Sequence, residues 1–100
     1  MRPPARRAAA HWLAVFCEPT RIAIIQSLAG GTRTVTDLAR ELRTDRANLP
    51  HHMRLLLDAG AVASARRGSF NRYSIAGAVE VAGGLEFAHP SGLKVVIPVS

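Results

Sequence analysis

Two neighbouring segments with the periodicity of amphipathic helices constrain the fold of this chain more than any other feature. In both, apolar residues recur at intervals of three and four, which places them on one helix face: Val35, Leu38, Ala39 and Leu42 in the first, and Leu49, Met53 and Leu56 in the second. Only a tight turn at Arg43-Thr44 separates the two segments. Two helices joined by a turn of about three or four residues form a helix-turn-helix.

Capping residues set the limits of these two helices. In Thr34-Val35-Thr36-Asp37 the Thr34 hydroxyl and the Asp37 carboxylate can each accept the other residue's backbone N–H, which is a capping box. Asp45 is a preferred N-cap for the second helix, and Ala59-Gly60 ends it. Pro50 is tolerated only near a helix start, so this helix is expected to begin between Asp45 and Asn48.

Two further helices are expected upstream. The first runs from about Ala5 to Cys17, with one apolar face made of Ala8, Trp12, Val15 and Phe16. The second begins at Pro19, whose missing N–H costs nothing at the first helical position. Its apolar stripe precedes the terminating pair Gly30-Gly31 and consists of Ile22, Ile25, Leu28 and Ala29.

Extended segments follow the helices. Residues Ala61–Arg66 and Phe70–Ala76 have strand character and flank a turn at Arg67-Gly68-Ser69, which predicts a β-hairpin with a basic tip. A helix-turn-helix followed by such a hairpin is a winged helix. The predicted fold is therefore mainly α with a small β-hairpin.

The tail, residues 77–100, is predicted to form a second hairpin. A helix through Val79, Ala82 and Leu85 is interrupted by Gly83-Gly84, and each glycine costs about 1 kcal/mol inside a helix. Residues 85–88 and 93–99 look like strands, since Leu93, Val95, Ile97 and Val99 alternate with their neighbours. A lone hairpin is marginal in water, so this one is expected to pack on the helix that carries Trp12 and Phe16, or on a second copy of the chain.

The charge of the chain is concentrated in its first three quarters. Its 100 residues carry a net charge of +6, and they allow a single domain with a core at about 9–76 and a tail at 77–100. Twelve Arg and five acidic residues give residues 1–76 a net charge of +7, whereas one Lys and two Glu give the tail −1. Such a field favours nucleic acid first and an anionic membrane surface second.

The one cysteine, Cys17, excludes an intramolecular disulfide and lies in an apolar stretch, so we expect an inert core thiol in a reducing cytoplasm. No stretch has the roughly 20 apolar residues of a membrane span. No phosphate loop, acid–base pair or nucleophile–base arrangement appears, so we expect neither an enzyme nor a cofactor.

Three stretches together resemble the ArsR/SmtB family of winged-helix transcriptional regulators. Glu18-Pro19-Thr20-Arg21-Ile22 resembles the opening of the family's second helix, and residues 49–56, Leu-Pro-His-His-Met-Arg-Leu-Leu, resemble its recognition helix. Residues 58–62 with Arg66-Arg67-Gly68 resemble the entry into its wing. The resemblance covers about residues 9–76, and it implies a DNA-binding homodimer that represses a nearby operon.

The positions that bind metal in the family's sensors differ here. Thr34 and Thr36 stand where those sensors carry Cys-x-Cys, and hydroxyls are not soft metal ligands. The tail offers only Glu80, Glu86 and His89 for the family's C-terminal site. We therefore expect no metal site.

The expected DNA-binding residues fall into two sets. The recognition-helix set points away from the core and comprises Arg46, Ala47, Asn48, Pro50, His51 and Arg54. The wing set, expected on phosphate or in the minor groove, comprises Arg66, Arg67, Gly68, Ser69 and Arg72. His52 faces inward and is expected to be a hydrogen-bonded structural residue.

These observations predict a dimeric, sequence-specific DNA-binding regulator with double-stranded DNA as its partner. One alternative is a winged helix that binds protein with the same face, which a less basic recognition helix would favour. The other is a metal- or thiol-responsive sensor that uses Cys17.

Overall fold

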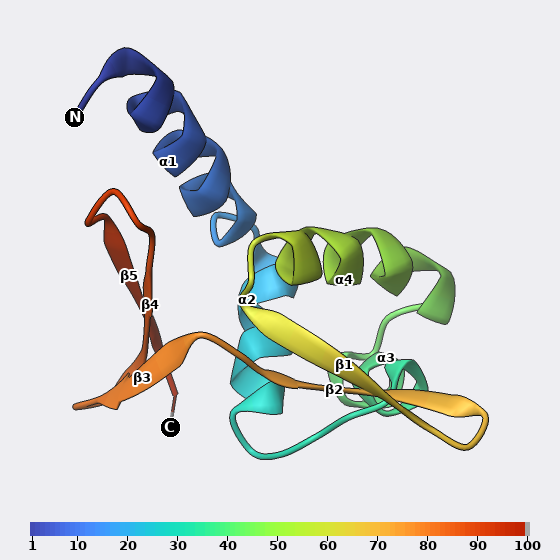
Figure 1. Ribbon diagram of the computed structural model, residues 1–100. Coiled ribbons are helices and arrows are strands. Elements are labelled where there is room, and N and C mark those ends of the chain that lie inside the picture. The colour runs from blue at the N-terminus through green and yellow to red at the C-terminus, as the bar shows by residue number, and fades with distance from the viewer. Residues whose placement is uncertain (100) are drawn as a thin grey trace.

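The computed structural model describes residues 1–99, and only Ser100, the last residue of the expected tail, lies outside the described residues. Its N-terminal half is helical and its C-terminal half is built from strands (Figure 1). The helices are α1 (Pro3–Val15), α2 (Pro19–Leu28), α3 (Val35–Leu42) and α4 (Leu49–Asp58). A 3₁₀ turn, Arg46–Asn48, leads into α4.

The strands form two separate antiparallel sheets. β1 (Val62–Arg67) and β2 (Phe70–Ile75) make the wing, and their pairing closes at Arg67 and Phe70 around a turn whose Gly68 has φ 61°. The tail contains β3 (Ala78–Val81), β4 (Gly84–Ala88) and β5 (Lys94–Pro98) in the order β3-β4-β5. The predicted winged helix-turn-helix and the tail hairpin β4–β5 are confirmed.

The first strand of the tail, β3, was not predicted, because the sequence analysis assigned no structure to residues 78–81. β3 pairs with β4 through a turn in which Gly83 has φ 79°, a conformation that favours glycine. The predicted limits of the first helix were also wrong, because α1 begins at Pro3 and ends at Val15. Within it Ala9, rather than Ala8, is buried.

The capping box predicted at the start of α3 is present, whereas the cap predicted for the recognition helix is not at the start of α4. The Thr34 hydroxyl accepts the Asp37 N–H at 3.1 Å, and the Asp37 carboxylate accepts the Thr34 N–H at 2.9 Å. Glu18 caps α2 by accepting the Arg21 N–H at 3.0 Å. Asp45 caps the 3₁₀ turn rather than α4 itself, because it accepts the N–H of Ala47.

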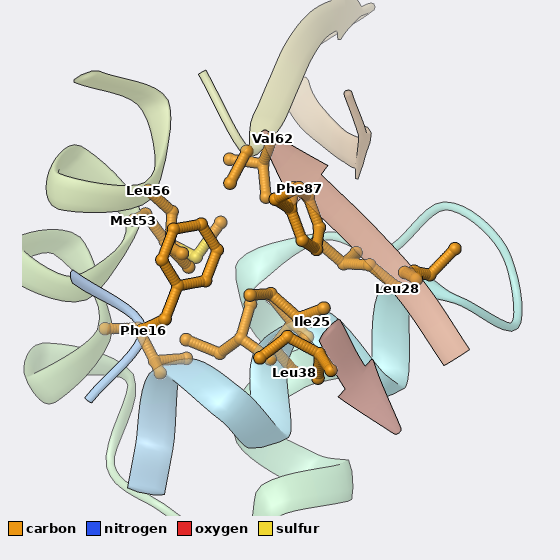
Figure 2. Close-up of a cluster of buried hydrophobic side chains, with 13 residues drawn as sticks. Phe16, Ile25, Leu28, Leu38, Met53, Leu56, Val62 and Phe87 are labelled. Atoms are coloured by element: carbon orange, nitrogen blue, oxygen red, sulfur yellow. The ribbon is translucent and has the colours of Figure 1, made fainter. Parts of the chain in front are cut away.

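One core joins the helices to both sheets. Figure 2 shows Phe87 of β4 in the same cluster as Phe16, which follows α1, and Met53 of α4. The Phe16 and Phe87 ring centroids are 5.1 Å apart, so the tail packs on the end of the first helix, as expected. Each large apolar side chain buried here stabilises the fold by about 1.5–3 kcal/mol.

Candidate nucleic-acid interface

The recognition segment divides into a buried face and an exposed face, as its periodicity predicts. Leu49, Met53 and Leu56 are fully or almost fully buried against the other helices. All six residues of the predicted recognition set are exposed: Arg46, Ala47, Asn48, Pro50, His51 and Arg54. Arg46, Ala47 and Asn48 form the 3₁₀ turn, so these three side chains project from the segment just before α4.

The wing carries its basic residues on an exposed ribbon. All five members of the predicted wing set are exposed: Arg66, Arg67, Gly68, Ser69 and Arg72. Figure 1 shows the β1–β2 ribbon extending past α3 to a free tip. Nothing in the described residues covers this tip, so its guanidinium groups are available to a partner.

A shallow hollow of about 180 Å³ connects the two predicted sets. It lies between the start of α3, the 3₁₀ turn and the wing, and its lining includes Thr36, Arg46 and Ser69. The recognition turn and the wing therefore approach each other at this hollow, although Arg46 and Ser69 are 23 positions apart in the sequence.

The base of the wing is tied to the loop before α3. The backbone N–H groups of Arg33 and Tyr73 each donate to the other residue's carbonyl oxygen, at 3.1 and 2.8 Å. Arg72 also donates to the Thr32 hydroxyl at 3.3 Å. At the same corner, Arg33 pairs with Glu41 at 2.7 Å, and Ser27 donates to that carboxylate. These contacts fix the wing's direction relative to the helix-turn-helix.

His52 connects the recognition helix to the corner between α1 and α2. Its Nδ1 lies 3.1 Å from an Arg21 guanidinium nitrogen and 3.6 Å from the Glu18 carboxylate. Arg21 in turn donates through Nε to the Val15 carbonyl oxygen at 2.6 Å. His52 is thus a hydrogen-bonded structural residue, as its inward position predicts.

The same cluster sets the ionisation of Glu18. Burial opposes the charge of this carboxylate, but the backbone N–H groups of Arg21 and Thr20 and the positive charges nearby outweigh it. The pKa of Glu18 consequently lies below its ordinary value. Glu18 therefore acts as an ionised anchor for Arg21 and His52 at neutral pH.

The expectation that Cys17 is a core thiol was wrong. Cys17 is exposed, and its Sγ donates to the Leu13 carbonyl oxygen at 3.4 Å. The reason is that α1 ends at Val15, so the chain turns Phe16 into the core and Cys17 toward solvent.

Two kinds of residue on this face escaped the sequence prediction. Phe70, at the wing tip, is 61% exposed, which is unusual for a large aromatic side chain. Arg40 and Arg43 are exposed at the end of α3, and Arg43 takes a left-handed conformation with φ 51°. The signal for Arg43 was its place in the turn before Arg46, and for Arg40 it was its position three residues earlier in α3. For Phe70 the sequence shows no sign that the side chain points outward.

Among residues 1–99, no three histidine, cysteine or acidic side chains are grouped closely enough to hold a metal ion. Within the same residues, every helix is too short or too polar to cross a bilayer.

The fold and this face define a helix-turn-helix transcriptional regulator. Residues 17–65 match a helix-turn-helix domain family. The chain is 34% identical over 68 residues, 67% of its length, to the uncharacterized HTH-type transcriptional regulator MJ1325 of Methanocaldococcus jannaschii, and covers 76% of that protein. It is 33% identical over 58 residues, 58% of its length, to the transcriptional repressor SdpR of Bacillus subtilis. That second match spans 64% of SdpR, slightly less than two thirds of its length.

Solved structures agree with these relatives. Rv0081 of M. tuberculosis superposes with a TM-score of 0.70 at 30% identity, over 75% of this chain and 76% of that one. A possible transcriptional regulator for arsenical resistance gives 0.60 at 36% identity, over 64% and 67% of the two chains. The homodimeric winged helix-turn-helix domain of Mb0332 from Mycobacterium bovis, a possible ArsR-family regulator, shares the fold with a TM-score of 0.67 at 24% identity, over 74% and 68%. The chain belongs to the helix-turn-helix transcriptional regulators, which bind DNA, and it shares the winged fold of the Mb0332 domain.

Proposed function

We propose that this protein is a cytoplasmic, homodimeric repressor that binds a specific duplex DNA sequence through the recognition turn and the wing. The observation that carries the proposal is the hollow lined by Arg46 and Ser69, because it brings one residue of each predicted set to the same side of the molecule. A helix in the major groove with an adjacent ribbon on the backbone needs that arrangement.

In this proposal the start of the recognition segment reads bases. Arg46 forms a bidentate contact with guanine, and Asn48 pairs with adenine. Ala47 and Pro50 pack against the groove, while His51 and Arg54 reach bases or phosphates. On the wing, Arg66, Arg67 and Arg72 contact phosphate or the minor groove, where Gly68 and Ser69 allow close approach of the backbone.

Repression, dimerisation and domain extent complete the proposal. SdpR is named a transcriptional repressor, and the Mb0332 domain is described as homodimeric. Residues 1–100 act as one winged-helix unit rather than a core with a dispensable tail, because Phe87 and Ile97 belong to the same core as the helices.

The test is selection of bound duplexes from random DNA, followed by affinity measurements at several salt concentrations. Arg46→Ala should cost about 1–3 kcal/mol and relax the preference at one base pair. Arg67→Ala should weaken binding to all sequences alike and flatten the salt dependence. The matched control is Arg2→Ala, since the N-terminus lies at the opposite end of the molecule from the wing (Figure 1).

Equal affinity for random and selected duplexes would show that the protein is not a sequence-specific regulator. A loss of base preference in Arg67→Ala but not in Arg46→Ala would reverse the roles proposed for the two elements.

A further inference from the structure

A second cavity, of about 500 Å³, lies away from the DNA-binding face. It opens between α1, the C-terminal end of α4 and the turn that joins β4 to β5. Figure 1 shows α1 standing between α4 and the β4–β5 hairpin. The volume is within the range of small-molecule sites.

The walls of this cavity are mainly apolar, with His11, Asp58 and His89 as the polar members, and ring contacts hold them in place. Trp12, Val15 and Leu55 contribute apolar surface. The Trp12 ring packs edge-on against Phe16, with centroids 4.9 Å apart, and lies 5.5 Å from the ring of His89. His89 is itself fixed, because its Nδ1 accepts the Ser91 backbone N–H at 3.1 Å and lies 2.9 Å from the Ser91 hydroxyl. A site built this way loses little entropy when a ligand binds.

One acidic side chain faces this apolar site. Asp58 lines the cavity, and no arginine or lysine does. It is the last residue of α4, where the negative end of the helix dipole makes a carboxylate unfavourable. No ion pair offsets this cost within residues 1–99. A carboxylate that lies at the unfavourable end of a helix and has no ion-pair partner is the kind of residue expected at a functional site.

We propose that this cavity binds an organic cation with an aromatic or apolar body, and that the bound cation changes the protein's affinity for DNA. The cationic group lies beside Asp58 and against the Trp12 ring, where both the carboxylate and the ring face attract it. The apolar body fills the space along Val15 and Leu55. Because Leu55 and Asp58 belong to α4, the ligand contacts the helix that carries Pro50, His51 and Arg54. This second effect depends on the DNA-binding function proposed above.

The binding test uses Trp12, the only tryptophan of the chain, as an intrinsic probe. Benzyltrimethylammonium is titrated at constant ionic strength, with neutral benzyl alcohol and anionic phenylacetate as comparison ligands. We expect a saturable change in Trp12 fluorescence that is strongest for the cation. Asp58→Asn should weaken its binding about fivefold, the size expected for one exposed ion pair. Glu80→Gln, which removes a carboxylate that does not line the cavity, should bind as the parent chain does.

Equal responses to the three ligands, or an Asp58→Asn variant with unchanged affinity, would overturn the cation site. The second measurement repeats the DNA titration over a series of benzyltrimethylammonium concentrations. The cation should shift the DNA affinity of the parent chain and of Glu80→Gln at the same concentrations, whereas Asp58→Asn should need about fivefold more cation for the same shift. No shift in any of them would overturn the regulatory role. A chain that binds the cation but has no preferred DNA sequence supports the site and contradicts the proposed repressor function.

Discussion

Asp37 shows how a single carboxylate at a helix start makes the fold sensitive to acid. The backbone N–H and then the hydroxyl of Thr34, followed by the charges of Arg40 and Arg72, hold the pKa of Asp37 below its ordinary value. A lowered pKa in the folded state means that the ionised group contributes stability above the ordinary value of 3.8, and that this contribution is lost as pH falls through the folded value.

Asp37→Asn should therefore lower the free energy of unfolding at neutral pH, and the difference from the parent chain should shrink as pH falls below 3.8. Urea denaturation at a series of pH values measures this. If the free energies of unfolding of the parent chain and of Asp37→Asn differ by the same amount at every pH, ionisation of Asp37 adds nothing to the capping box.

The adjacent histidines His51 and His52 provide a matched pair of opposite roles. His52→Ala removes the contact between α4 and Arg21, so the free energy of unfolding should fall by about 1–2 kcal/mol. His51→Ala changes an exposed side chain, so stability should stay within about 0.5 kcal/mol while DNA affinity falls. Denaturation and DNA titration of both variants test the assignment, and a stability loss for His51→Ala equal to that for His52→Ala would contradict it.

At the scale of elements, the start of α4 explains why a proline is accepted in the recognition helix. Pro50 is the second residue of α4, where a backbone N–H has no intrahelical acceptor, and its ring already fixes a helical φ. Pro50→Ser should consequently lower the free energy of unfolding by about 0.4–1 kcal/mol, because it only adds freedom to the unfolded chain. Thermal denaturation checks this, and a stabilised variant would mean that the N–H of residue 50 gains a hydrogen bond.

Elements specified by local chemistry could be predicted from the sequence, whereas those that depend on distant partners could not. The capping box at Thr34 and the periodicity of α3 and α4 are local, and both were predicted correctly. β3 was missed because it has only four residues and is defined by its pairing with β4 rather than by a buried apolar side, since Val79 and Val81 are 62% and 36% exposed.

Two features of the candidate site were hidden for similar reasons. The Arg21 partner of His52 lies 31 residues away along the chain, and no sequence pattern marks that contact. The exposure of Cys17 depends on a helix end, the least certain part of any sequence prediction. The outward phase of His51 and Arg54 was predictable, because it follows from the buried positions of Leu49, Met53 and Leu56. Helical spacing alone would place Arg46 on the buried side, and it is exposed because it lies in the 3₁₀ turn before α4.

At the scale of the whole molecule, α1 is the element that most lacks partners in a single chain. Of its 13 residues only Ala9 is buried, and helices of about this length are marginal on their own. One side of α1 packs on the tail through Trp12, and Phe16, which follows the helix, extends this contact. Another side remains open along Ala10 and Ala14, whose small side chains allow a second helix to approach closely. We therefore place the centre of the proposed dimer at α1 of both chains, with the tail sheets beside it.

Truncation of the tail is a poor test of this dimer, because it would remove Phe87 and Ile97 from the core and destabilise each chain. A charge placed on the open side of α1 is more selective. Ala14→Glu should convert the dimer into a folded monomer, because two bulky carboxylates would have to be desolvated in a close contact between small side chains. Ala82→Glu, at the exposed turn between β3 and β4, is the matched control and should remain dimeric. Light scattering with circular dichroism at tens of micromolar protein distinguishes the outcomes: a monomeric parent chain would rule out the dimer, and a dimeric Ala14→Glu would place its interface elsewhere on the molecule.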